Sequence, residues 1–280
     1  LIDGQQLAAT SFGETDDQGN WVPIEYAAED ESDLVLTYED SLVNATNTTA
    51  YTFSSADLGT ADADRYIVVA VSTHAAPGRT LSSVVINGVT ASLGPKQANA
   101  ANEDWVQMAW AAVPDDATGD IVVTFSGSAN GCGIGIHRII GRPYFYDVDG
   151  EGVTGTAGQT YVNTVSGGVI INVTHNSDSK SVSYTGITER YDETEDVTHF
   201  HSGASATVTT GAAQQSVLAT FSGSVGKANQ TISFAPGKAY GVNGFRLDFA
   251  SSSHFGKDVK TAVANATVTA TASAVDSSNA

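Results

Sequence analysis

The sequence predicts an all-β protein: two tandem β-sandwich modules, of jelly-roll or immunoglobulin-like type, inserted in a small β scaffold formed by both chain ends. Three observations carry this prediction. Short runs rich in β-branched residues are separated by Gly, Asn, Asp and Ser, helical periodicity is almost absent, and landmarks of one half recur in the other. The strongest runs are 66–72, 83–86, 120–125 and 168–174.

An internal repeat divides the centre of the chain. Its landmarks recur in the same order: His74, Gly88 and Gly127 as His175, Gly186 and Gly223. The spacing between copies is about one hundred residues, the size of one β-sandwich. We therefore expect these segments: 1–37, first half of the scaffold; 38–146, first sandwich; 147–160, an acidic, glycine-rich linker; 161–237, second sandwich; 238–280, second half of the scaffold and a tail.

Composition limits the possible functions. The 280 residues are 41% apolar, enough for packed cores, and 12 basic against 31 acidic residues leave a net charge of −19. That charge disfavours binding to nucleic acid phosphates. The single cysteine, Cys132, excludes an intramolecular disulfide and a cysteine-based zinc cluster. The first residues lack a signal-peptide pattern and no run is apolar enough to insert in a membrane, so we expect a soluble protein.

The two predicted scaffold segments resemble a known element. Trp21, Pro23 and Tyr26 fit the pattern W-x-P-x-x-Y, and residues 240–249, Tyr-Gly-Val-Asn-Gly-Phe-Arg-Leu-Asp-Phe, are followed by a Gly-Lys-Asp turn. Together they resemble an element of bacteriophage tail-fibre and related virion fibre proteins, in which the two halves are contiguous. In this chain about two hundred residues separate the two halves. This arrangement is typical of a domain inserted into another domain.

The predicted sandwiches resemble phage proteins as well. Residues 52–71, 79–91, 119–127 and 132–136 are similar to β-modules of phage and prophage tail or fibre proteins, and residues 184–192 and 199–206 to a companion module. The resemblance implies a virion fibre or spike component exposed on the particle, which attaches to a host receptor or polysaccharide. It also implies contacts with other virion proteins and with copies of the chain, commonly as a trimer. A purely structural capsid or tail role and a capsule depolymerase are the alternatives.

Histidines are the candidate metal ligands. His199 and His201 lie two apart on a predicted strand, so both imidazoles face the same side and can share an ion. Histidines beside carboxylates on a surface strand without any ion are the alternative. His74 and His175 occupy equivalent repeat positions, which indicates a structural role, such as a hydrogen bond to a turn carbonyl, rather than ligation.

The acidic run Asp147, Asp149 and Glu151 around a glycine has a partial calcium-loop pattern, but the remaining ligands of such a loop are missing. A solvated acidic linker is the favoured interpretation.

Aromatic residues are the candidate ligand-binding groups. Trp105 follows a polar loop and is expected to stand exposed, and Tyr144 and Tyr146 flank the predicted linker. Such rings stack on sugars and anchor protein interfaces. The chain has no G-x-S-x-G nucleophile elbow, and its Ser-Gly-Ser triplets recur at equivalent repeat positions, which favours architecture. We therefore expect no catalytic residues and no cofactor.

Overall fold

The computed structural model describes residues 13–15, 21–23, 33–195 and 198–237. The chain divides into two units, one of Glu31–Gly237 and one of the two terminal segments. In the terminal unit the described residues form a hairpin, β1 (Gly13–Thr15) paired with β2 (Trp21–Pro23). The predicted second scaffold half, 238–280, lies outside the described residues, as does Tyr26.

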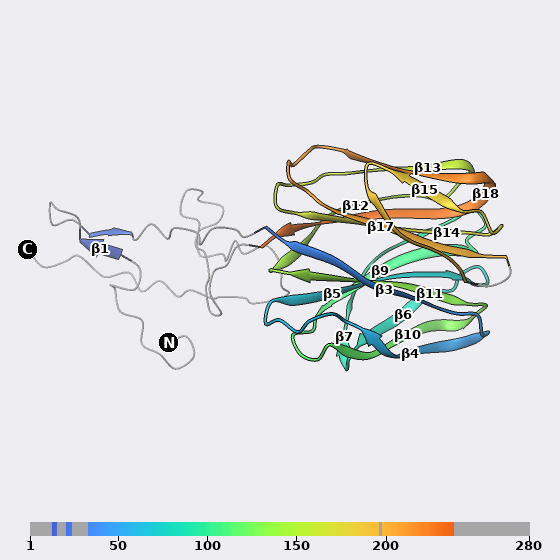
Figure 1. The fold of residues 1–280 in the computed structure, drawn as a ribbon, viewed down its shortest axis with the longest axis horizontal. Helices are drawn as coiled ribbons and strands as arrows, with labels where there is room; N and C mark the ends of the chain where they lie inside the picture. Colours follow the sequence, from blue (N-terminus) through green and yellow to red (C-terminus); the bar gives the residue numbers. More distant parts are fainter. Residues whose placement is uncertain (1–12, 16–20, 24–32, 196–197, 238–280) are drawn as a thin grey trace, which may run out of the picture. The chain divides into compact units, whose positions relative to one another are not determined.

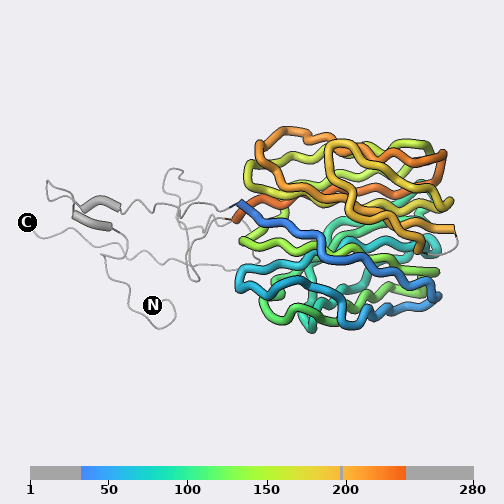
Figure 2. Tube along the Cα trace, viewed as in Figure 1, coloured from blue at the N-terminus to red at the C-terminus, as the bar shows by residue number. Residues whose placement is uncertain are grey.

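The central unit is all-β, which confirms the predicted fold class. Because its described residues form no helix, none of them belongs to a helix that could cross a membrane. Its strands are antiparallel throughout, and they build two sandwiches that occupy consecutive stretches of the chain (Figure 2).

The first sandwich has an outer and an inner sheet. The first outer sheet runs in the order β4 (Thr48–Asp57), β10 (Thr118–Ala129), β6 (Leu81–Ile86) and β7 (Val89–Thr90). The first inner sheet runs in the order β3 (Val35–Asn44), β11 (Cys132–Ile140), β5 (Arg65–His74), β9 (Asp104–Ala112) and β8 (Ser92–Ala98).

The second sandwich is built the same way, except that one long strand, β18 (Gln215–Pro236), serves both of its sheets. The second inner sheet runs in the order β12 (Pro143–Glu151), β18, β14 (Val169–Asn176), β17 (Phe200–Thr207) and β16 (Thr188–Thr194). In the second outer sheet β13 (Thr154–Val162) and β15 (Val182–Thr185) flank the first half of β18.

The two inner sheets share one topology. In each, the first strand of the sandwich lies at an edge, the last strand lies next to it, and the most buried strand, β5 or β14, is central. The sequence landmarks fall at equivalent places. His74 and His175 lie at the ends of β5 and β14, and Gly88 and Gly186 follow β6 and β15 with φ of +82° and +87°. The topology therefore agrees with the duplication that the repeat predicts.

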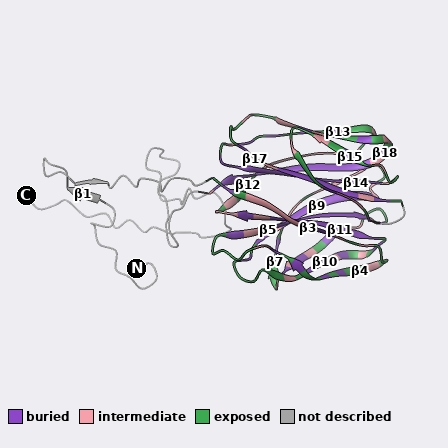
Figure 3. Ribbon diagram, in the orientation of Figure 1, coloured by how far each residue is buried: buried purple, intermediate pink, exposed green. Residues whose placement is uncertain are grey.

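The sheets stack in four layers, outer, inner, inner, outer (Figure 1). Ile67, Val69 and Val71 of β5 face the core of the first sandwich, while Val68 and Ala70 face the second sandwich. Both inner sheets are thus covered on both faces, and buried residues concentrate there (Figure 3). This explains why β5 is continuously apolar from Tyr66 to Val71 and why every residue of β14 is buried.

The core of the second sandwich is divided by polar side chains. Asn172 donates from Nδ2 to Asn229 Oδ1 and to Thr231 Oγ1, both at 2.8 Å, and Thr160 Oγ1 lies 2.6 Å from Thr231 Oγ1. All four residues are fully buried. Mutual hydrogen bonds offset the desolvation cost that buried amides and hydroxyls would otherwise carry.

Two predicted boundaries are wrong. Residues 147–160 are no linker, since they form most of β12 and β13, and the second sandwich begins at Pro143. Gly158 of β13 lies over buried side chains, where an added Cβ would come within 3.0 Å of Asn229 Nδ2. A glycine is therefore required at position 158 by close packing within the sandwich, not by a turn in a linker. The first sandwich begins earlier than residue 38, at the start of β3.

Candidate functional site

A polar cluster lies between the two inner sheets. Along the face of β5 that meets the second sandwich, Val68 and Ala70 are followed by Ser72 and His74. On β14, residues 169, 171 and 173 are apolar and His175 follows on the same face. The apolar interface between the sandwiches therefore changes at one end into a cluster of histidines and carboxylates.

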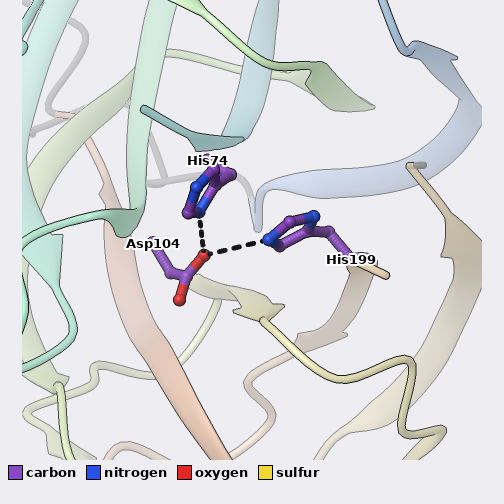
Figure 4. A group of neighbouring side chains, drawn as sticks. All are labelled: His74, Asp104 and His199. Atoms are coloured by element: carbon purple, nitrogen blue, oxygen red, sulfur yellow. Dashed lines mark hydrogen bonds and ion pairs between the residues drawn. The ribbon is translucent and has the colours of Figure 1, made fainter. Parts of the chain in front are cut away.

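Asp104, the first residue of β9, is the centre of this cluster. Its Oδ1 lies 2.8 Å from His74 Nδ1, 3.4 Å from His175 Nδ1 and 3.7 Å from His199 Nε2. Figure 4 shows the rings of His74 and His199 converging on this oxygen. The other oxygen, Oδ2, accepts a hydrogen bond of 2.6 Å from Asn99 Nδ2, which fixes the carboxylate plane.

Glu195 forms a second arm of the cluster. Its Oε2 lies 3.2 Å from His175 Nε2 and accepts a 3.0 Å hydrogen bond from Ser72 Oγ. Ser72 Oγ also lies 2.7 Å from His201 Nδ1, and the His201 ring packs against Tyr191 with centroids 4.5 Å apart. Both sandwiches thus contribute to one connected polar network.

Glycines in β11 and directly before it make room for this network. An added Cβ at Gly131 would lie 2.8 Å from Glu195 Oε1, and one at Gly133 would lie 2.6 Å from the His201 ring. Gly135 faces Tyr191 in the same way. The Gly-Cys-Gly-Ile-Gly run is therefore explained by close contact between the two inner sheets.

The electrostatics of the cluster favour an ionised Asp104. Burial alone would raise the pKa of Asp104, but the neighbouring His175 and His74 outweigh it and hold that pKa well below its usual range. Burial alone would lower the pKa of His175, yet Glu195 and Asp104 raise it to about 9. For His201, burial and the neighbouring His175 lower the pKa to about 3, so this ring is neutral.

The predicted metal pair is divided between two sets of partners. His199 lies with His74 and Asp104, whereas His201 contacts Ser72 and Tyr191. His74 and His175 meet carboxylates, not the turn carbonyl suggested for them. Sequence reasoning missed Asp104, although the pairing of β5 with β9 places it directly opposite His74.

Of the three aromatic residues predicted to bind a ligand, one is buried in a core and two are exposed on the surface. Trp105 is fully buried, which overturns its expected exposure: it packs edge-on against Phe125 at 5.4 Å in the first core. Tyr144 and Tyr146 are 38% and 40% exposed on edge strand β12, with ring centroids 6.1 Å apart. Phe145 between them stacks on Trp110 at 5.6 Å.

The acidic run has a structural role that the calcium-loop and linker interpretations both missed. Asp147, Asp149 and Glu151 lie on β12. They accept hydrogen bonds from the backbone N–H groups of Tyr161 at 2.8 Å and Gln159 at 2.5 Å on β13, and of Asn163, the residue after β13, at 2.7 Å. β13 is an edge strand, so these carboxylates cap amides that would otherwise be open to pairing with another chain.

A scan of the sequence against protein-family models, a search of curated proteins and a search of solved structures each found no match.

Proposed function

We propose that the chain is a non-catalytic component of a bacteriophage fibre or spike that presents a surface for attachment to host polysaccharide or to a receptor. The observation that carries the attachment role is the exposed pair Tyr144 and Tyr146 on β12. The virion context comes from the resemblance of the chain's segments to phage fibre proteins.

An aromatic pair on a fixed strand suits sugar binding. β12 pairs with β18 on both sides of a register shift at Tyr146, and Phe145 stacks on Trp110. The backbone that carries the two tyrosines is therefore held in place before a ligand arrives, which lowers the entropic cost of binding. Phenol rings stack on the apolar faces of sugars, and their hydroxyl groups supply hydrogen bonds.

The proposed assembly multiplies weak contacts. In a homotrimer attached to other virion proteins, several copies of the aromatic strand would face one host surface, and linked sites gain avidity through effective concentration. The net charge of −19 favours partners other than nucleic acid.

A polysaccharide array and a host-cell adsorption assay test the proposal. We expect the Tyr144→Ala/Tyr146→Ala variant to bind at least about tenfold more weakly than the parent, with an unchanged melting temperature, because both rings are surface groups. Tyr161→Ala, at an exposed tyrosine of neighbouring β13, is the matched control and should retain binding.

Each alternative gives a different result. If the parent protein fails to bind susceptible cells, a purely structural capsid or tail role replaces attachment. If purified polysaccharide releases new reducing ends, the protein is a depolymerase. If the double variant binds as well as the parent, Tyr144 and Tyr146 do not form the attachment surface.

A further inference from the structure

We propose that His74, Asp104 and His199 bind a divalent transition-metal ion of the zinc class, which joins the two sandwiches. His74 and Asp104 belong to the first inner sheet, and His199 directly precedes β17 of the second. This ligand set differs from the pair His199 and His201 that strand alternation suggests, and it is independent of the proposed attachment role.

The distances fit such an ion. One donor atom from each of the three residues lies within 4.8 Å of the other two. Asp104 Oδ1 is 2.8 Å from His74 Nδ1 and 3.7 Å from His199 Nε2. Four ligands about 2.0–2.1 Å from a tetrahedral zinc ion lie about 3.3 Å apart, a value between the two observed separations.

The surrounding groups orient the donors. Thr198 Oγ1 lies 3.0 Å from His199 Nδ1, so it can accept that N–H and leave the Nε2 lone pair directed at Asp104. Asn99 occupies Asp104 Oδ2 and leaves Oδ1 for the ion. Hydrogen bonds of this kind to the non-ligating atoms are typical of metal sites, where they fix tautomers and raise ligand basicity.

His175 lies beside Asp104 but is not one of the three proposed ligands. His175 is fully buried, with Nδ1 3.4 Å from Asp104 Oδ1 and Nε2 3.2 Å from Glu195 Oε2. Neither of its ring nitrogens makes a hydrogen bond of good geometry with the described residues.

The site is accessible from one side. The side chains of His74 and His199 are 24% and 11% exposed, whereas that of Asp104 is 3% exposed and that of His175 is fully buried. An ion can therefore enter past the two outer imidazoles. Imidazole donors favour zinc, copper, nickel and cobalt over calcium and magnesium, which prefer oxygen ligands.

The test uses tag-free full-length protein, freed of metal by chelation and titrated with Zn²⁺ and Co²⁺ at neutral pH. We expect one Zn²⁺ per chain by mass spectrometry of bound metal, a higher melting temperature, and the intense visible bands of tetrahedral Co²⁺. Ca²⁺ should give no comparable shift. Absence of Zn²⁺ binding at millimolar metal would overturn the proposal.

Substitutions identify the ligands. His74→Gln and His199→Gln should each weaken Zn²⁺ binding by at least about 100-fold, beyond the usual effect of outer-shell residues. Both side chains are partly exposed, so the metal-free variants should melt near the parent. Glu103→Gln, beside Asp104, is the matched control for a nearby carboxylate and should bind normally. Loss of binding in His201→Gln with retention in His74→Gln would show that the ligand set is wrong.

Discussion

At the scale of single residues, Arg65 secures one end of the first sandwich. Its fully buried guanidinium donates to four or more backbone carbonyls, including Val113 at 2.6 Å, Gly59 at 2.7 Å and Asp115 at 2.6 Å. We expect Arg65→Lys to lower the free energy of unfolding by about 3–5 kcal/mol although the charge is kept, because an ammonium group cannot reproduce the planar fork of donors. Equilibrium denaturation with urea measures this loss.

A surface arginine is the control for that substitution. Arg142 is 45% exposed and pairs with Asp64 through a 3.3 Å contact. Arg142→Lys should change the free energy of unfolding by less than about 0.5 kcal/mol. Equal effects at positions 65 and 142 would contradict the role given to the buried guanidinium.

His137, also buried, gives stability a pH dependence of defined sign. Burial, with a smaller effect of Arg190, lowers its pKa to about 3, while the unfolded imidazole titrates near about pH 6.5. Between these values the unfolded chain binds more protons. The contribution of neutral His137 is therefore complete above pH 6.5 and is lost as the pH falls toward 3, by up to about 1.4 kcal/mol per pH unit.

The His137→Leu variant isolates this contribution. Its free energy of unfolding, measured by urea titration from pH 7 to pH 4, should fall less steeply with decreasing pH than that of the parent. Parallel curves would show that His137 titrates normally in the folded protein.

At the scale of elements, the carboxylates of β12 protect the edge of β13. Asp149 accepts from the Tyr161 amide at 2.8 Å and Glu151 accepts from the Gln159 amide. In Asp149→Ala we expect the Tyr161 amide to exchange its hydrogen about tenfold faster, because a charge-assisted hydrogen bond is lost. Residue-resolved hydrogen exchange measures this effect. In Glu151→Ala the faster amide should be that of Gln159, and a uniform change along β13 in both variants would contradict the pairing.

At the scale of the whole molecule, the apolar interface between the inner sheets should make the sandwiches unfold together. Ile171 of the second sandwich packs in the central core with Val68 and Met108 of the first. We expect Ile171→Ala to destabilise both sandwiches by about 2–5 kcal/mol. In a Trp21→Phe/Trp110→Phe background the remaining tryptophan, Trp105, packs in the core of the first sandwich, so its fluorescence reports on that sandwich.

The two sandwiches can be distinguished by this probe. If they are coupled, Ile171→Ala shifts the tryptophan fluorescence transition together with the circular dichroism of all strands. If the fluorescence transition stays at its parental midpoint, the sandwiches unfold independently, and the central core contributes little to cooperativity.

The sequence by itself determined the all-β class and predicted the duplication. Both depend on local properties: β-branched runs such as 66–72 favour strands wherever they lie, and His74 and His175 mark equivalent strand ends because copies of one unit keep their order.

Only the tertiary structure decided what the strands face. Trp105 is buried although a polar loop precedes it, because β9 is central enough to be covered by the first outer sheet. Asp104 and His199 meet only because the two inner sheets stack. Local alternation indicates which side chains share a face of a strand. The residues that pack against that face come from segments far away in sequence. Which segments these are depends on the total apolar area that the four stacked sheets bury, and this is not a local property.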